Sequence, residues 1–478
     1  MISVRPRVHD GRTRDVHSPK THRAVPFYAF TPYLPTVRSQ FIAVTAAQQS
    51  SAPVTNALAD AFRYIAAHDF PDRWPTLVQS LNAALCSGDL SSTLAALRLL
   101  RVFAYHYHLK KVPGGGPMAI MCHGILSLVH QVAQFLIANH NTVEAASAIH
   151  LALKFYYSTI EYQLGRYPSA CNSSSFIAWC GLCNSVLVKV LDPAALPAMA
   201  DSDTRAAWPW WKAKKWAAKI VARIAEKYGK PSDFDDDTDE EAPALKALAV
   251  IFNKNIAPEV VSTALAQLAA WTSSGGAVSS AAWLSPRVRQ AYLSLISSAS
   301  DFSSVWKPLQ PHMPLLIEGV IFSLLRPTAE DIEEFENDPE QWLVSQDDIL
   351  MSYTSPACAA EHLLRVLAEK RHATTLPIVD RFIRGTCEAY AAVAPASRDH
   401  GAKDAVMRML VVIASTYEEK RKGRTRAALE SLLTNFVTPE LAPEALPLLR
   451  VRAMHVWSAF SDVKGVPDDA KVVACRGM

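Results

Sequence analysis

Residues 286–296 read P-R-V-R-Q-A-Y-L-S-L-I, a proline followed by an arginine–valine–arginine start and an apolar helical pattern. Residues 449–457, L-R-V-R-A-M-H-V-W, repeat the arginine–valine–arginine start and the apolar pattern, with leucine in place of the proline. A turn followed by such a start begins one helix of a helical hairpin, whose apolar face stays uncovered until the next hairpin stacks on it. The two stretches therefore predict a repeating array of stacked helical hairpins.

Helical periodicity extends over most of the chain, which supports this reading. Two clear series are Leu94, Leu97, Leu100, Ala104 and Tyr107, and Val406, Leu410, Ile413 and Tyr417. Half of the 478 residues are hydrophobic and only 17 are glycine, while the alternating segments and Asn-Gly or Asp-Gly turns typical of sheet are scarce. We predict an all-α fold, an α-solenoid superhelix of HEAT-like hairpin repeats with an outer and an inner layer. A compact helical bundle is the alternative.

Short proline-containing breaks separate the apolar segments. Proline disfavours helical geometry in the residue before it, so each break predicts a helix boundary. The breaks lie at Phe70-Pro71, Pro113 to Pro117, Tyr167-Pro168, Asp192-Pro193, Lys230-Pro231, Ser285-Pro286, Lys307-Pro308 and Pro395. They give helices of about 15–25 residues joined by short turns.

The chain divides into three expected parts. Residues 1–36 carry several arginines and little apolar periodicity, which indicates a basic, disordered leader rather than a transit peptide. Residues 37–465 form the predicted solenoid, and residues 466–478 an irregular tail.

Eight cysteines, mostly inside apolar helices, indicate a reducing compartment. Residues 112–143 lack charged side chains, but a polar stripe at helical spacing favours a packed helix over membrane insertion.

A block of seven acidic residues occupies residues 330–342, E-D-I-E-E-F-E-N-D-P-E-Q-W. Ile332, Phe335 and Trp342 are spaced to pack against a helical surface, so we expect a packed helix that presents its carboxylates outward. A structural acidic helix and a contact for a basic protein remain equally open. The candidate contacts are Glu330, Asp331, Glu333, Glu334, Glu336 and Asp338.

A second acidic run, D-F-D-D-D-T-D-E-E, occupies residues 233–241. With little to bury, it predicts a flexible loop, either a solvated spacer or a charged attractor that speeds association with a basic partner. The candidate residues are Asp235, Asp236, Asp237, Asp239, Glu240 and Glu241.

A basic stripe follows the tryptophan-rich stretch W-P-W-W-K-A-K-K-W-A at residues 208–217. Its candidate residues are Lys212, Lys215, Lys219 and Arg223, beside a predicted core face of Trp216, Ile220, Ile224 and Tyr228. The stripe is either a solvated edge or a surface that pairs with an acidic neighbour, in an adjoining repeat or a bound protein. Direct nucleic-acid binding is disfavoured, because stacking needs exposed rings and these are expected to be buried.

No combination of residues in the sequence indicates catalysis. Cys180 and Cys183 form a single C-x-x-C with no second pair, so buried helical thiols are favoured over a zinc or redox site. We therefore predict a protein-binding molecule that is not an enzyme, with no cofactor and no metal.

Three stretches together carry a resemblance to a known family. They are H-D-F-P-D-R-W-P at residues 68–75, the tryptophan-rich stretch at residues 208–217, and the acidic block. In this order they resemble the karyopherin-beta (importin-beta-like) nuclear transport receptors, in the branch that includes importin seven and importin eight. The leader resembles no importin N-terminal domain, so the chain is expected to correspond to the N-terminal half of a receptor without that domain, as a truncated form.

The resemblance implies an importin-type receptor that shuttles between cytoplasm and nucleus. It implies three kinds of partner: Ran-GTP, basic cargo proteins and phenylalanine-glycine nucleoporins. Import and export are not distinguished by the sequence. A HEAT-repeat scaffold subunit of another complex, without a role in transport, is the alternative function.

Overall fold

The computed structural model describes residues 34–48, 51–110, 113–161, 164–191, 201–235, 240–346, 355–420 and 430–461. Within these ranges every regular element is a helix, which confirms the all-α prediction. The α-helices are α1 (Leu34–Ala47), α2 (Ala52–Asp69), α3 (Leu77–Leu85), α4 (Leu90–Tyr107), α5 (Gly116–Asn139), α6 (Val143–Ile160), α7 (Pro168–Cys171), α8 (Ser173–Val188), α9 (Ser202–Ala207), α10 (Pro209–Tyr228), α11 (Ala242–Ile251), α12 (Ala257–Ser273), α13 (Pro286–Ala299), α14 (Ser303–Leu309), α15 (Phe322–Leu325), α16 (Ala329–Asn337), α17 (Pro339–Gln346), α18 (Pro356–Lys370), α19 (His372–Ala392), α20 (His400–Lys420) and α22 (Pro447–Ser461).

Short 3-10 and π-helical segments connect or extend these helices. The 3-10 segments are η2 (Pro113–Gly115), η3 (Leu164–Arg166), η5 (Pro231–Phe234), η7 (Gln310–His312), η10 (Pro395–Ser397) and η12 (Thr438–Leu441). The π-helical segments are η6 (Phe252–Ile256), η8 (Leu315–Ile321) and η11 (Leu433–Val437).

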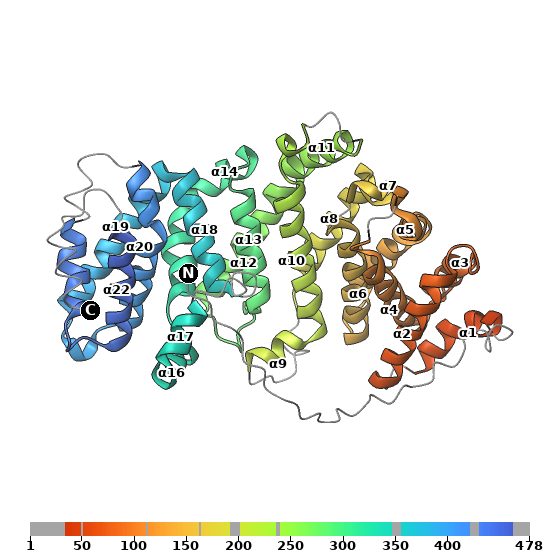
Figure 1. Cartoon of the computed structure of the whole chain (residues 1–478), viewed down its shortest axis with the longest axis horizontal. Helices are drawn as coiled ribbons and strands as arrows, with labels where there is room; N and C mark the ends of the chain where they lie inside the picture. Colours follow the sequence, from red (N-terminus) through yellow and green to blue (C-terminus); the bar gives the residue numbers. More distant parts are fainter. Residues whose placement is uncertain are drawn as a thin grey trace, which may run out of the picture.

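The helices form two layers that run along the length of the molecule (Figure 1). In layer A, each of α3, α5, α8, α12, η8 and α19 packs against the next. In layer B, the same holds for α2, α4, α6, α10, α13, α18, α20 and α22. Contacts between the layers join α3 to α4, α5 to α6, α8 to α10 and α12 to α13. Each hairpin thus contributes one helix to each layer, as the predicted solenoid requires.

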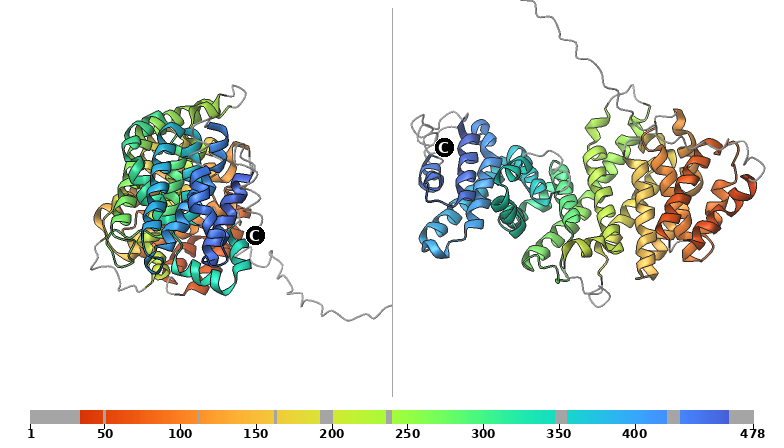
Figure 2. Two further views of the ribbon diagram at one scale, coloured as in Figure 1. Left: turned by 90° about the vertical axis from the view of Figure 1, so that its left-hand side faces the viewer. Right: turned by 60° about the horizontal axis from the view of Figure 1, so that its bottom comes forward.

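Sequence order follows the long axis of the molecule from one end to the other (Figure 1). Viewed toward one end, the same helices overlap in a small cross-section, and the third view again shows an elongated body (Figure 2). The apolar core is continuous along this length: Leu97 of α4, Trp179 of α8 and Leu410 of α20 are all fully or almost fully buried. A solenoid buries its apolar faces in this way because each hairpin covers the one before it.

Most of the predicted helix boundaries are confirmed. Helix α2 ends at Asp69, directly before Phe70-Pro71, and α7 and α13 begin at Pro168 and Pro286. Proline is favoured in the first turn of a helix, where its missing N–H would have no intrahelical acceptor. The break at Asp192-Pro193, the side chain of Tyr417, residues 1–33 and the tail at 466–478 lie outside the described residues.

The boundary predicted at Lys307-Pro308 is wrong. Pro308 lies inside α14, and helical backbone continues through η7 and η8 into α15. Burial on both sides of this segment explains the difference, because Val305, Leu309 and Met313 are all buried. Packing keeps the backbone helical, and the π-helical turns of η8 follow the prolines, where the regular hydrogen-bond ladder is interrupted.

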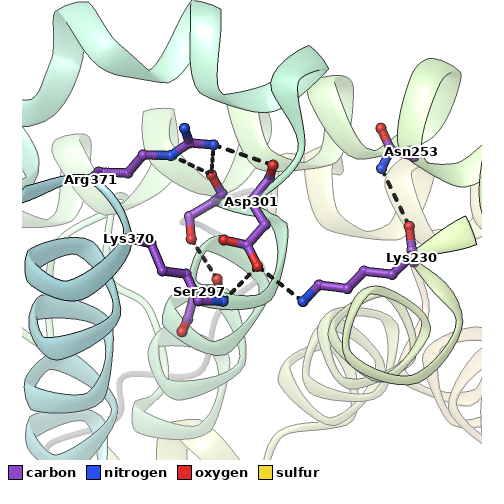
Figure 3. A network of polar contacts seen from close by, with 8 residues as sticks. Lys230, Asn253, Ser297, Asp301, Lys370 and Arg371 are labelled. Carbon is purple, nitrogen blue, oxygen red and sulfur yellow. Dashed lines mark hydrogen bonds and ion pairs between the residues drawn. The ribbon is translucent and has the colours of Figure 1, made fainter. Parts of the chain in front are cut away.

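One polar junction joins three successive layer-B helices (Figure 3). The Asp301 carboxylate, just after α13, accepts from Lys370 at the end of α18 and pairs at 3.0 Å with Lys230, which follows α10. Arg371 donates to the Ser300 carbonyl at 2.9 Å and lies 4.7 Å above the Trp306 ring. Burial opposes ionisation of Asp301, but hydrogen bonds and charge from the two lysines outweigh it and lower its pKa.

Asp301→Asn removes the charge that pairs with Lys230 and Lys370, and is expected to lower the free energy of unfolding at pH 7. The expected loss is only about 1 kcal/mol, because both lysines are partly exposed and solvent screens their charge. The pKa of Asp301 is lower in the folded than in the unfolded protein. The carboxylate therefore contributes to stability at pH values above its pKa in the unfolded protein. This contribution is lost as the pH falls through its pKa in the folded protein. Urea unfolding at pH 7 and near pH 3 checks this. Asp60→Asn, which breaks an exposed pair with Arg63, is the control, and an equal effect of both substitutions would contradict the junction's role.

Candidate protein-binding surfaces

The acidic block forms two short helices, α16 and α17, that project from the body of the solenoid (Figure 1). Two of its seven carboxylates cap helices: Asp331 and Thr328 form a reciprocal capping box at the start of α16, and Asp338 accepts from the Gln341 N–H at 2.9 Å. The remaining five are exposed and have no ion-pair partner among the described residues. They are Glu330, Glu333, Glu334, Glu336 and Glu340.

Aromatic packing holds the block in place. The Phe335 and Trp342 rings are both buried and meet edge to face at 5.1 Å. The Arg452 guanidinium of α22 lies 5.5 Å from the centre of the Trp342 ring and also donates at 2.8 Å to Asp404 of α20. The carboxylates are therefore presented outward from an anchored base, as predicted.

Two details of that prediction need correction. The block is two helices rather than one, because Asp338 and Pro339 end the first helix and start the second. Ile332 is 39% exposed instead of packed. The short α16 buries only Phe335, so a second apolar residue three positions earlier finds no surface to cover.

The second acidic run is structured at both ends. Phe234 lies in η5 and stacks on Tyr228 with ring centres 6.4 Å apart, while Asp235 pairs with Lys246 at 2.6 Å. Glu241 pairs with Arg166 at 3.6 Å. The predicted flexible loop is therefore wrong at its ends. Glu240 is exposed, and Asp236, Asp237 and Asp239 lie outside the described residues.

The basic stripe lies on α10 in layer B. Lys212, Lys215 and Arg223 are half-buried and Lys219 is exposed. Arg223 pairs with Glu226 at 3.0 Å and donates to the Glu161 carbonyl at 3.1 Å. Its acidic partner thus lies on its own helix, and its bond to the neighbouring repeat is to a backbone carbonyl.

Trp216 is the centre of a cationic cluster rather than part of a buried core face. Its ring is half-buried, and the ammonium groups of Lys154 and Lys219 each lie 4.9 Å from the ring centre. Lys219 is also 4.4 Å from the Tyr157 ring. Lys154 and Tyr157 belong to α6, so sequence reasoning missed the cluster. The pairing of α6 with α10 across the layer is what brings these residues together.

Burial and neighbouring positive charge both act on this cluster. Burial, followed by the charges of surrounding cations, lowers the pKa of Lys154 to about 8 and that of His150 to about 3. The cations that act on Lys154 are Arg101 of α4 and Lys212, Lys215 and Lys219 of α10. Desolvated like charges raise the cost of keeping each group protonated. An added negative charge would therefore stabilise the protonated form of these groups.

The C-x-x-C thiols are buried, as predicted. Cys180 and Cys183 of α8 are free, and burial raises the pKa of both well above the ordinary range. A thiol in that environment stays protonated and is a poor nucleophile or metal ligand.

Helix α5 is, by length and composition, the one described helix apolar enough to cross a membrane. It packs against α3, α6, α7 and α8 within the solenoid. Part of its apolar surface faces solvent, where Ile120 is 48% and Phe135 58% exposed, and Ile177 on the adjoining α8 is 47% exposed. Layer A thus presents apolar side chains on two neighbouring helices.

Comparison with known proteins agrees with this architecture, although no family model matches the chain. Importin-8 of Mus musculus is 28% identical over 404 residues, which cover 84% of this chain and 37% of importin-8. The importin beta-like SAD2 homolog of Arabidopsis thaliana is 25% identical over 393 residues, 82% of this chain and 36% of that protein. The chain therefore spans little more than a third of these relatives.

The fold also matches a solved structure. The exportin Cse1 in its cargo-free, cytoplasmic state superposes with a TM-score of 0.64 at 15% identity, covering 90% of this chain and 44% of Cse1. This likeness shows the solenoid fold. Over most of its length the chain is a homologue of importin-8 and the importin-beta-like proteins, with a karyopherin solenoid fold that fits the importin seven/eight branch.

Proposed function

We propose that this chain is the solenoid segment of a nuclear transport receptor, which binds basic protein cargo and moves between cytoplasm and nucleus. The observation that carries the proposal is the anchored acidic block on a solenoid homologous to importin-8. Its five exposed glutamates have no ion-pair partner among the described residues, and Phe335 and Trp342 hold them in place. Less conformational entropy is lost when a partner binds a surface that is already ordered.

Arginine- and lysine-rich segments, such as nuclear localisation signals, are the cargo chemistry that suits this block. Clustered negative charge attracts such a segment over distance and speeds encounter, and single short contacts then add modest affinity. Cargo binding is accordingly expected to be fast and strongly salt-dependent.

Layer A suits phenylalanine-glycine nucleoporin repeats. Ile120, Phe135 and Ile177 expose apolar surface on α5 and α8, and insertion of a phenylalanine ring between neighbouring helices would remove that surface from water. The acidic block lies on α16 and α17, several repeats away from α5 and α8. Nucleoporin docking on α5 and α8 therefore leaves the block free for cargo.

Phe135→Ser combined with Ile177→Ser is expected to weaken binding of phenylalanine-glycine repeats about tenfold, because two exposed apolar contacts are lost. Binding of the full chain to bead-bound repeats measures the effect. Val54→Ser with Val143→Ser removes similarly exposed apolar groups from α2 and α6 and is expected to change little. Equal loss in the two double variants would argue against a docking site on α5 and α8.

Ran-GTP is the proposed regulator, and a pulldown with GTP-locked Ran tests the transport function as a whole. Retention of Ran on the full chain supports a receptor, whereas no retention, together with exclusion of the labelled chain from nuclei of permeabilised cells, favours a scaffold. Displacement of a basic cargo peptide by Ran-GTP identifies an importer, and tighter cargo binding an exporter.

A further inference from the structure

We propose that the cationic cluster around Trp216 is a second binding surface, which takes an extended Asp/Glu-rich polypeptide segment laid across α4, α6 and α10. The cluster consists of Arg101, His150, Lys154, Lys212, Lys215 and Lys219. Its partner is opposite in charge to the proposed cargo. The inference therefore does not depend on the transport function or on its direction.

The arrangement of the cations defines a track across layer B. Lys212, Lys215 and Lys219 lie at three- and four-residue steps and share one face of α10, spanning about 10 Å along its axis. Lys154 on α6 and Arg101 on α4 extend the positive charge over the next two helices, which lie side by side (Figure 1). Neighbouring helix axes are about 8–10 Å apart, so roughly six extended residues would cross the track.

Within the molecule, the Glu161 carboxylate acts on Lys219, but no carboxylate acts on Lys154 or Lys215. Every charged group that acts on Lys154 or Lys215 is a cation, including Arg287 of α13. Helix α5, which also packs against α6, carries no lysine, arginine or carboxylate. The guanidinium of Arg98, one turn before Arg101 on α4, has a buried N–H group without a hydrogen-bond partner among the described residues. Lys154 and Lys215 are half-buried and no carboxylate acts on them, so they are stabilised most by an external anion.

Carboxylates fit this surface better than nucleic acid. Binding of single strands relies on aromatic rings that bases can stack upon. Here the Trp216 ring is covered by Lys154 and Lys219, and its edge meets Tyr157 at 5.1 Å. Flexible ammonium groups over occupied rings can follow the carboxylates of an irregular acidic segment.

Fluorescence anisotropy with a labelled eight-residue peptide of Asp and Glu, on the full chain at low salt, tests the proposal. Lys154→Gln with Lys215→Gln is expected to weaken binding about tenfold. Lys254→Gln with Lys307→Gln removes the same charge from exposed lysines elsewhere and is expected to change affinity less than twofold. Equal affinities of the two double variants would overturn the proposal, as would tighter binding of a single-stranded oligonucleotide of equal charge.

Proton uptake provides a second readout that a merely structural cluster would not give. Binding of carboxylates restores the protonated form of Lys154, so calorimetry at pH 8 in two buffers of different ionisation enthalpy should show net uptake. Lys154→Arg keeps the charge and is expected to bind the peptide with reduced uptake. Absence of uptake in the unmodified chain would contradict the assignment. Neither readout involves Ran, basic cargo or nucleoporins, so its failure is distinguishable from failure of the transport function.

Discussion

Asp404→Ala is expected to lower the free energy of unfolding by about 3–5 kcal/mol, because it leaves a buried guanidinium without its partner. The side chains of Asp404 and Arg452 are 1% and 7% exposed and meet at 2.8 Å between α20 and α22. Arg452 also lies over Trp342, so the same change should loosen the base of the acidic block. Urea unfolding measures the first effect and amide hydrogen exchange in α16 and α17 the second.

A double variant separates loss of the ion pair from loss of packing. Asp404→Leu with Arg452→Met replaces both charges by apolar groups, and is expected to recover most of the lost stability, because no uncompensated charge stays buried. A single Asp404→Ala variant that unfolds within about 1 kcal/mol of the unmodified chain would show that the pair does not stabilise this end of the solenoid.

Neutralising the five exposed glutamates of the acidic block is expected to weaken binding of a lysine- and arginine-rich peptide about 100-fold at low salt. The variant is Glu330→Gln, Glu333→Gln, Glu334→Gln, Glu336→Gln and Glu340→Gln. Asp331 and Asp338 are left unchanged because they cap helices. Anisotropy of the labelled peptide measures the effect, which should shrink as added salt screens exposed charge.

The matched control removes five exposed carboxylates elsewhere on the solenoid. It combines Asp60→Asn, Asp72→Asn, Glu144→Gln, Asp203→Asn and Glu388→Gln, all at exposed positions. Because the net charge of the two variants is equal, a similar loss of affinity in both would mean that overall charge, not the block, attracts the peptide. Selective loss in the block variant supports cargo binding there.

Local sequence signals were enough to predict the helical repeats. The series from Leu94 to Tyr107 forms the buried face of α4, and Pro168 and Pro286 begin helices. Such features depend on periodicity and on backbone restrictions within a few residues, so they can be read without knowing what packs against them. The aromatic anchors Phe335 and Trp342 were predictable for the same reason.

Contacts between repeats were beyond reach of the sequence. Lys154 and Trp216 belong to different hairpins, as do Asp404 and Arg452, and stacking alone brings each pair together. At Pro308 the sequence predicted a helix end that the structure does not have. Burial of the neighbouring residues overrides the local preference of proline to end the helix. Sites assembled from several helices therefore emerge only with the packing of the layers.

The hairpins stack into one extended two-layer solenoid, which places the acidic block and the cationic cluster on different repeats. Small-angle X-ray scattering tests this extended stacking most directly. A compact particle of this length would have a radius of gyration of roughly 23 Å. The full chain is predicted to give a clearly larger value, with a long-tailed distance distribution and a cross-section about two helices thick. A value near 23 Å with a symmetric distribution would contradict the solenoid.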